Sequence, residues 1–164
     1  MEKVNLVIAL AQINATVGDF PGNLEKITEA MRLGETKNAH LIVFPELALT
    51  GYPPKDLLHF PDFIYAARKA LDDIVVFSQN CKIGALVGTI MENPHPRGRR
   101  LTNSAVMVSS GKIVFQYDKM FLPNYDVFDE VRYFEAGKKP GAFEYLGNKI
   151  AVTICEDLWN DAEM

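Results

Sequence analysis

Cysteine is scarce in this chain: Cys81 and Cys155 are the only two among 164 residues. Two cysteines cannot build the disulfide framework of a small secreted domain, and their spacing matches no zinc-ligand pattern. The three histidines, His40, His59 and His95, are scattered along the chain and pair with neither cysteine. We therefore expect a cytoplasmic protein without a bound metal.

Long apolar runs and an excess of positive charge are also missing. No stretch approaches the ~18 apolar residues that a membrane-spanning helix requires. The N-terminal "MEKVNLVIALAQ" resembles a signal peptide, but Asn5 and Gln12 confine its apolar run to residues 6–11, so a first buried strand is the better interpretation. The net charge of -4 and the pI near 5.4 give no general attraction to nucleic acid or anionic lipid. Neither a nucleic acid nor a membrane partner is expected.

The remaining composition, 48% hydrophobic and 23% charged residues, is typical of one globular domain with its own core. Unbroken apolar runs predict buried strands over residues 4–11, 41–44, 83–90 and 149–154, and a turn at "SSG" predicts a hairpin between 101–108 and 112–117. Apolar stripes predict two helices, one carrying Leu24, Ile27 and Met31 and one over residues 62–79. The order β-α-β-α-β followed by a hairpin predicts an α/β fold with parallel strands and an antiparallel extension.

Three polar residues stand at or just beyond the ends of predicted strands. Glu46 follows "LIVFP", Lys119 follows "IVFQYD" and Cys155 follows "IAVTI". Each has a plain structural explanation: a solvated loop acid, a surface lysine and a packed thiol. Ligands gather, however, where strand ends converge in parallel α/β sheets. A thiol that attacks a carbonyl needs a base, and the resulting oxyanion needs a cation or hydrogen-bond donors. The three residues together indicate a nucleophilic site, with glutamate as the base because no histidine lies at a comparable position.

The order Glu, Lys, Cys resembles that of the nitrilase superfamily of carbon–nitrogen hydrolases. The segments "AQINATVGDFPGN", "FPELALTGYPPKDLL", "YDKMFLPNYDVFDEVRYFEAG" and "ICEDLW" are similar to the N-terminal glutaminase (glutamine amidohydrolase) domain of glutamine-dependent NAD⁺ synthetases, over essentially the whole chain. The resemblance implies a nitrilase-like α-β-β-α sandwich. Because that fold continues beyond the nucleophile, we expect residues 1–164 to be its N-terminal part, incomplete at the C-terminal side. The synthetase domain, with its ATP and Mg²⁺, is expected to be absent.

The resemblance also implies a role for individual residues. Cys155 matches the nucleophile, Glu46 the general base, and Lys119 the cation that supports the tetrahedral intermediate. Glu130 matches a second glutamate that orients the site, and the backbone N–H of Glu156 would donate to the oxyanion. Tyr52 and Tyr125 match tyrosines that line the glutamine pocket, although burial in the core is the alternative for both. Cys81 is explained by packing at a helix end.

The implied activity is hydrolysis of the glutamine side-chain amide through a cysteine thioester, without a cofactor in this domain. The ammonia would serve NAD biosynthesis, in which a synthetase domain of the same parent chain, a ligase, uses ATP to amidate nicotinic acid adenine dinucleotide. We expect a homo-oligomer for the full-length enzyme and little or no activity for the 164-residue chain alone. Two alternatives stay open: a free-standing amidase acting on another small amide, and a non-catalytic module.

Overall fold

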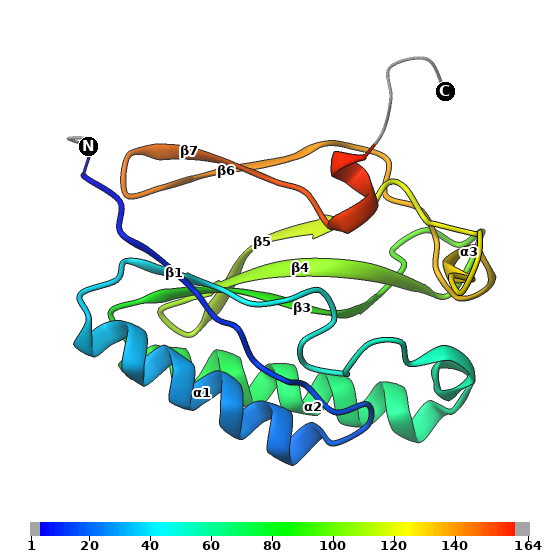
Figure 1. The fold of residues 1–164 in the computed structure, drawn as a ribbon, viewed down its shortest axis with the longest axis horizontal. Coiled ribbons are helices and arrows are strands. Elements are labelled where there is room, and N and C mark those ends of the chain that lie inside the picture. Colours follow the sequence, from blue (N-terminus) through cyan, green and yellow to red (C-terminus); the bar gives the residue numbers. More distant parts are fainter. Residues whose placement is uncertain (1–3, 160–164) are drawn as a thin grey trace.

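Seven strands and three α-helices make up the framework of residues 4–159, the part of the protein that a computed structural model describes (Figure 1). The strands are β1 (Ile8–Leu10), β2 (Leu41–Val43), β3 (Gly84–Glu92), β4 (Leu101–Ser109), β5 (Lys112–Asp118), β6 (Gly141–Tyr145) and β7 (Asn148–Val152). The α-helices are α1 (Phe20–Thr36), α2 (Pro61–Phe77) and the single turn α3 (Glu130–Tyr133). Three 3-10 helices complete the described part: η1 (Lys55–His59), η2 (Ser78–Asn80) and η3 (Cys155–Leu158).

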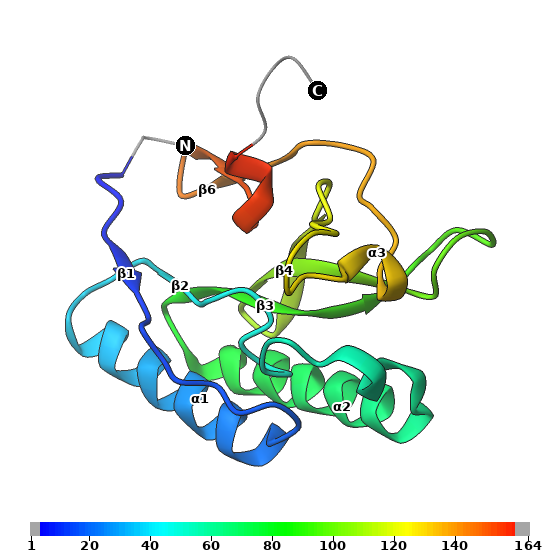
Figure 2. The same ribbon diagram turned by 45° about the vertical axis from the view of Figure 1, so that its right-hand side comes forward.

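The central sheet has the strand order β1-β2-β3-β4-β5. The first three strands are parallel, and β4 is antiparallel to both β3 and β5. Strand β5 therefore runs in the same direction as β2, and the chain leaves both strands at the same edge of the sheet. This arrangement confirms the predicted parallel strands and antiparallel hairpin. It also brings the segments that follow β2 and β5 to one side, as Figure 2 shows.

Helices α1 and α2 cover one face of this sheet (Figure 1). Helix α1 begins where the Asp19 side chain accepts a hydrogen bond from the backbone N–H of Gly22, at 3.0 Å. Its predicted apolar stripe is confirmed, because Ile27 and Met31 are fully buried and Leu24 packs beside them. Helix α2 starts with Pro61, whose missing N–H costs nothing in the first helical turn. The largest apolar cluster lies between these helices and the sheet.

Strands β6 and β7 form a separate antiparallel hairpin on the other face of the central sheet (Figures 1 and 2). A second core fills the space between the two sheets, with Leu41, Leu86, Ala105, Met107, Tyr117, Val152 and Ile154 buried in it. The order of layers is helix, sheet, sheet, which agrees with the predicted α-β-β-α sandwich. Within residues 4–159 no second helical layer is present, so the sandwich is incomplete there. In the same part of the chain, no helix is long and apolar enough to cross a membrane.

The expectation of a first strand buried over residues 4–11 is wrong. Only Ile8–Leu10 pairs with β2, and Ile8 and Leu10 are 47% and 71% exposed. Strand β1 is one of the two edge strands of the central sheet, and an apolar run does not reveal whether another layer covers such a strand. The last strand ends at Val152, two residues earlier than predicted. Its residues alternate between half-buried and exposed, and only Val152 is buried, because β7 belongs to an outer hairpin. Its partner β6 was missed because Gly141 follows Pro140 in a stretch that predicts loop structure.

Candidate active site

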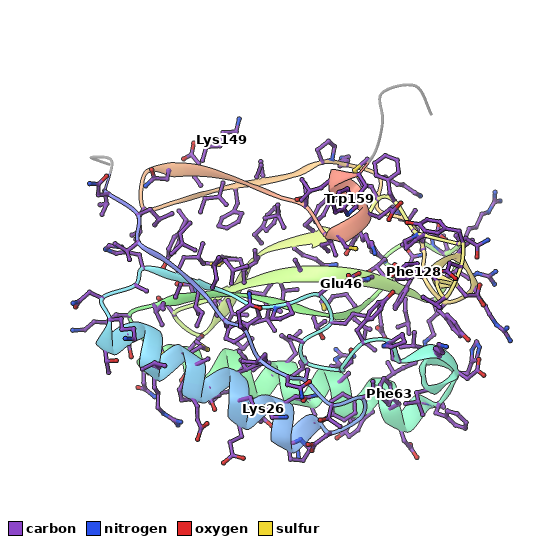
Figure 3. All side chains as sticks on the ribbon, viewed as in Figure 1. Lys26, Glu46, Phe63, Phe128, Lys149 and Trp159 are labelled. Atoms are coloured by element: carbon purple, nitrogen blue, oxygen red, sulfur yellow. The ribbon has the colours of Figure 1, made fainter. Side chains whose placement is uncertain are left out.

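Glu46 lies in the turn that follows β2, where Leu47 and Leu49 are fully buried and anchor the backbone. Strand β3 supports this turn at close range: a Cβ atom on Gly88 would overlap the carbonyl oxygen of Pro45 and lie 2.5 Å from the backbone nitrogen of Leu47. Gly88 also accepts a hydrogen bond from the Leu49 N–H at 3.1 Å. The Glu46 side chain remains 19% exposed. Figure 3 shows it beside the central sheet, below the turn that carries Trp159.

Lys119 follows β5 directly and its side chain is fully buried. Its Nζ lies 2.8 Å from Glu46 Oε1, 3.0 Å from Glu130 Oε1 and 2.9 Å from Glu130 Oε2. Burial, the largest single influence, acts to lower the lysine pKa, but the hydrogen bonds and charges of Glu46 and Glu130 outweigh it and raise the pKa overall. The lysine is therefore a buried ammonium between two carboxyl groups. The expectation that it is a surface lysine is excluded.

Glu130 is the first residue of α3 and is 4% exposed. Burial raises the pKa of its carboxyl group, while the hydrogen bond and charge of Lys119 oppose the change. The Tyr52 hydroxyl donates a hydrogen bond to Glu130 Oε1 at 3.0 Å. Burial, then the charge and hydrogen bond of Glu130, raise the pKa of Tyr52. Glu130 thus links the tyrosine to the lysine, which suits a residue that orients others.

Cys155 begins η3 and is exposed, so the packed-thiol interpretation is excluded. Its φ of 45° lies in the left-handed region, which is unfavourable for a side-chain-bearing residue and concentrates at functional sites. Although the residue is exposed, partial burial of its thiol has the largest effect and raises the thiol pKa. The Glu46 carboxylate also raises this pKa, whereas Lys119 acts to lower it. A cavity of about 120 Å³ is lined by both Cys155 and Glu46. The described contacts include no hydrogen bond between Cys155 and Glu46. In enzymes without bound substrate, catalytic hydrogen bonds are often long and tighten only when substrate binds.

The other predicted residues lie around this centre. The Tyr125 hydroxyl donates to Glu156 Oε2 at 2.9 Å, and that bond, followed by burial, raises the pKa of Tyr125. Tyr125 is 55% exposed and Tyr52 is 37% exposed, so neither is a core residue. They line different pockets, of about 620 Å³ beside Glu156 and about 250 Å³ beside Glu130. The backbone N–H of Glu156 lies in the first turn of η3, where N–H groups lack partners within the helix.

Two residues at the site were missed from the sequence. The Asn103 side chain, 1% exposed on β4, donates to Glu46 Oε1 at 2.6 Å. Oε1 thus accepts from both Asn103 and Lys119, while the described hydrogen bonds give Oε2 no donor. Asp157, in η3, accepts four hydrogen bonds. An available signal for Asn103 was the polar triplet Thr102–Ser104 inside an otherwise apolar strand, but nothing in the sequence distinguishes Asp157 from its acidic neighbour.

Metal ligands are not gathered anywhere between residues 4 and 159: no group of three His, Cys, Asp or Glu side chains could hold an ion there. Cys81 follows η2 and packs partly buried against the larger core, and burial raises the pKa of its thiol.

Comparison with known families decides how these features are to be interpreted. Residues 7–164 match the family described as "Carbon-nitrogen hydrolase". The chain belongs to the carbon–nitrogen hydrolase family. The predicted resemblance to the nitrilase superfamily is thereby confirmed. The predicted similarity to part of glutamine-dependent NAD⁺ synthetases is confirmed by the following matches.

This carbon–nitrogen hydrolase is 42% identical over 158 residues to the glutamine-dependent NAD(+) synthetase of Thermotoga maritima, a match covering 96% of the chain and 27% of that relative. It is 46% identical over 159 residues to the synthetase of Synechocystis sp., covering 94% and 28%. The chain thus spans a little over a quarter of the curated relatives it matches. A solved glutamine-dependent NAD+ synthetase from Acinetobacter baumannii superposes with a TM-score of 0.81 at 37% identity, covering 93% of this chain and 28% of that one.

An amidase from Nesterenkonia sp. superposes equally well, with a TM-score of 0.81 over 96% of this chain and 58% of the amidase. Its sequence identity is 21%, so the match shows a shared fold and nothing about substrate. The fold prediction of a nitrilase-like sandwich is confirmed by both kinds of neighbour.

Proposed function

We propose that this carbon–nitrogen hydrolase releases ammonia from the side-chain amide of glutamine through a thioester on Cys155. The observation that carries the proposal is the buried Lys119 ammonium, held between Glu46 and Glu130 beside an exposed cysteine. Relatives named glutamine-dependent NAD(+) synthetase support glutamine as the substrate. A substrate amide carbonyl in the cavity between Cys155 and Glu46 would lie within the field of the ammonium.

The first half of the reaction acylates the cysteine. Glu46 Oε2, which the described hydrogen bonds leave without a donor, takes the thiol proton as the sulfur attacks the amide carbon. A base is needed because the raised pKa keeps the thiol protonated at neutral pH. The carbon–sulfur bond forms, the carbonyl oxygen becomes an oxyanion, and the intermediate collapses as Glu46 returns the proton to the departing nitrogen. Ammonia leaves and a thioester remains.

The second half hydrolyses the thioester. Glu46 removes a proton from water, the hydroxyl adds to the thioester carbon, and cleavage of the carbon–sulfur bond returns the proton to the sulfur. The products are glutamate and ammonia, and the enzyme regains its thiol. Lys119 already contacts three carboxylate oxygens, as many as it has N–H groups, so it stabilises the oxyanion through its charge. Direct donation to the oxyanion falls to the backbone N–H of Glu156.

The remaining parts of the proposal concern the whole enzyme. We infer that residues 1–164 are the N-terminal part of a glutamine amidohydrolase domain. The ammonia would pass to a synthetase domain of the same parent chain, where ATP and Mg²⁺ support amidation of nicotinic acid adenine dinucleotide. This domain would need no cofactor, because its nucleophile, base and cation are all side chains. A cytoplasmic homo-oligomer fits that role.

Separate assays with glutamine and with ammonium salt test the proposal. In the full-length enzyme, Cys155→Ala should abolish NAD⁺ synthesis from glutamine, since no sulfur remains to form the thioester, and leave synthesis from ammonium unchanged. Cys81→Ala is the matched control and should retain both activities. Equal loss of both activities in Cys155→Ala would contradict the proposal, because the residue would then support folding or synthesis. Retained glutamine use would contradict it directly.

A further inference from the structure

Asp157 connects two segments that are far apart in the sequence. Its Oδ2 accepts hydrogen bonds from the Ile154 N–H at 2.9 Å and the Tyr117 hydroxyl at 2.7 Å. Its Oδ1 accepts from the N–H groups of Met120 at 3.1 Å and Phe121 at 3.0 Å. A carboxylate has about four acceptor sites, so these four donors occupy its whole capacity. Asp157 is therefore not available as a proton acceptor for the reaction.

The donors flank the two residues at the centre of the site. Tyr117, Met120 and Phe121 lie on either side of Lys119, and Ile154 directly precedes Cys155. Lys119 follows β5 of the central sheet, and Cys155 lies just beyond β7 of the outer hairpin. The Asp157 carboxylate therefore links the central sheet to the outer hairpin beside these two residues. A helix-capping role would explain the Ile154 contact alone. It would not explain the three donors from the segment around Lys119.

We propose that Asp157 is a positioning residue that holds the Cys155 turn against the Lys119 segment and so sets the alignment of sulfur, base and cation. The inference rests on the function proposed above. Hydrogen bonds to a carboxylate are shorter and stronger than neutral ones, which suits a link between two loops. The left-handed backbone at Cys155 also needs surrounding contacts to persist, and Asp157 supplies one at the preceding residue.

Asp157→Asn in the full-length enzyme tests the proposal. An asparagine has one acceptor oxygen in place of two, so it can keep at most two of the four hydrogen bonds, and its NH₂ group would face backbone N–H donors on the other side. We expect kcat for glutamine hydrolysis to fall about 100-fold, because a displacement of about 1 Å costs that much, with KM changed by less than about threefold. Tyr117→Phe removes one donor of the four and should cost less than about tenfold. Asp73→Asn, an exposed change on α2, is the matched control and should have no effect.

Two reagents separate alignment from folding. The glutamine-like electrophile 6-diazo-5-oxo-L-norleucine needs an aligned site, whereas iodoacetamide needs only an accessible thiol. Asp157→Asn should slow labelling by the first reagent about 100-fold and leave iodoacetamide labelling within about threefold. Wild-type turnover in Asp157→Asn would overturn the inference. So would a loss of thermal stability that parallels the loss of turnover, which would show a general folding role. Failure of the proposed function would be distinguishable, because Cys155→Ala would then either retain glutamine use or lose synthesis from glutamine and from ammonium equally.

Discussion

At the scale of single residues, the site combines groups with opposite effects on the pKa of the Cys155 thiol. Glu46 and Lys119 act in opposite directions on the Cys155 thiol, and the carboxylate has the larger effect of the two. The raised pKa keeps the proposed nucleophile protonated at neutral pH, and the proposed base is the same group that disfavours the thiolate. A change of charge at Glu46 or Lys119 therefore alters the titration of the Cys155 thiol.

The pH dependence of Cys155 alkylation should reveal this coupling. In a Cys81→Ala background, iodoacetamide labelling should show a midpoint above that of an ordinary cysteine, because burial and Glu46 raise the thiol pKa. Glu46→Gln removes the negative charge, so the midpoint should shift to lower pH while hydrolysis falls about 10²- to 10⁴-fold. Lys119→Met removes the positive charge and should shift the midpoint upwards. An unchanged midpoint in Glu46→Gln would show that the carboxylate does not act on the thiol.

At the scale of elements, the site depends on a close approach between β3 and the turn that carries Glu46. Gly88→Ala should displace that turn, because the added Cβ would meet the backbone of Pro45 and Leu47, which cannot move aside like the end of a flexible side chain. We expect a destabilisation of about 1–3 kcal/mol and a loss of turnover of about 100-fold. Urea unfolding and glutamate release measure the two effects.

Gly34→Ala in α1 is the matched control for Gly88→Ala. Its Cβ would meet the flexible end of Ile83 at 2.8 Å, away from backbone atoms, and alanine favours the helix. Turnover should be retained. If Gly88→Ala also retained full turnover, the support that β3 gives to Glu46 would be unimportant for catalysis.

The elements also show what sequence could and could not predict. The stripes of α1 and α2 and the hairpin of β4 and β5 were predictable, because local periodicity and turn residues determine them. Glu46, Lys119 and Cys155 stood out by their positions after apolar runs. The exposure of β1 was not predictable. It depends on the position of β1 at the edge of the sheet and on whether another layer covers it, and neither can be read from an apolar run. Asn103 and Asp157 were not predictable either, because their importance arises from donors and acceptors that only the folded chain brings together.

At the scale of the whole molecule, two of the places where apolar side chains remain uncovered bear on association. Ile8 and Leu10 are exposed on β1, an edge strand of the central sheet, and Leu158 and Trp159 are 72% and 75% exposed at the end of η3, next to Cys155. Open strand edges pair with other chains, and exposed apolar groups favour association. The turn that carries the nucleophile thus has little packing on its outer side.

The 164-residue chain by itself should therefore self-associate and hydrolyse glutamine poorly, because catalytic geometry must be held to within about 0.5 Å by packed neighbours. Light scattering and glutamate release are the measurements. Leu10→Lys places a charge on the open edge and should reduce association without restoring turnover. A monodisperse wild-type chain with the turnover of the full-length enzyme would contradict this prediction.

The buried ion cluster has a further consequence for the end of the reaction cycle. With Glu130 ionised, Lys119 contributes one positive charge against two carboxylates, so the cluster carries an excess of negative charge. In the proposed reaction, a glutamine amide would enter this field uncharged, and hydrolysis would convert it into a carboxylate at the same place. Like charges at short range repel strongly where water is scarce. The site would therefore expel its own product, and glutamate present in the cell would compete weakly with glutamine for entry.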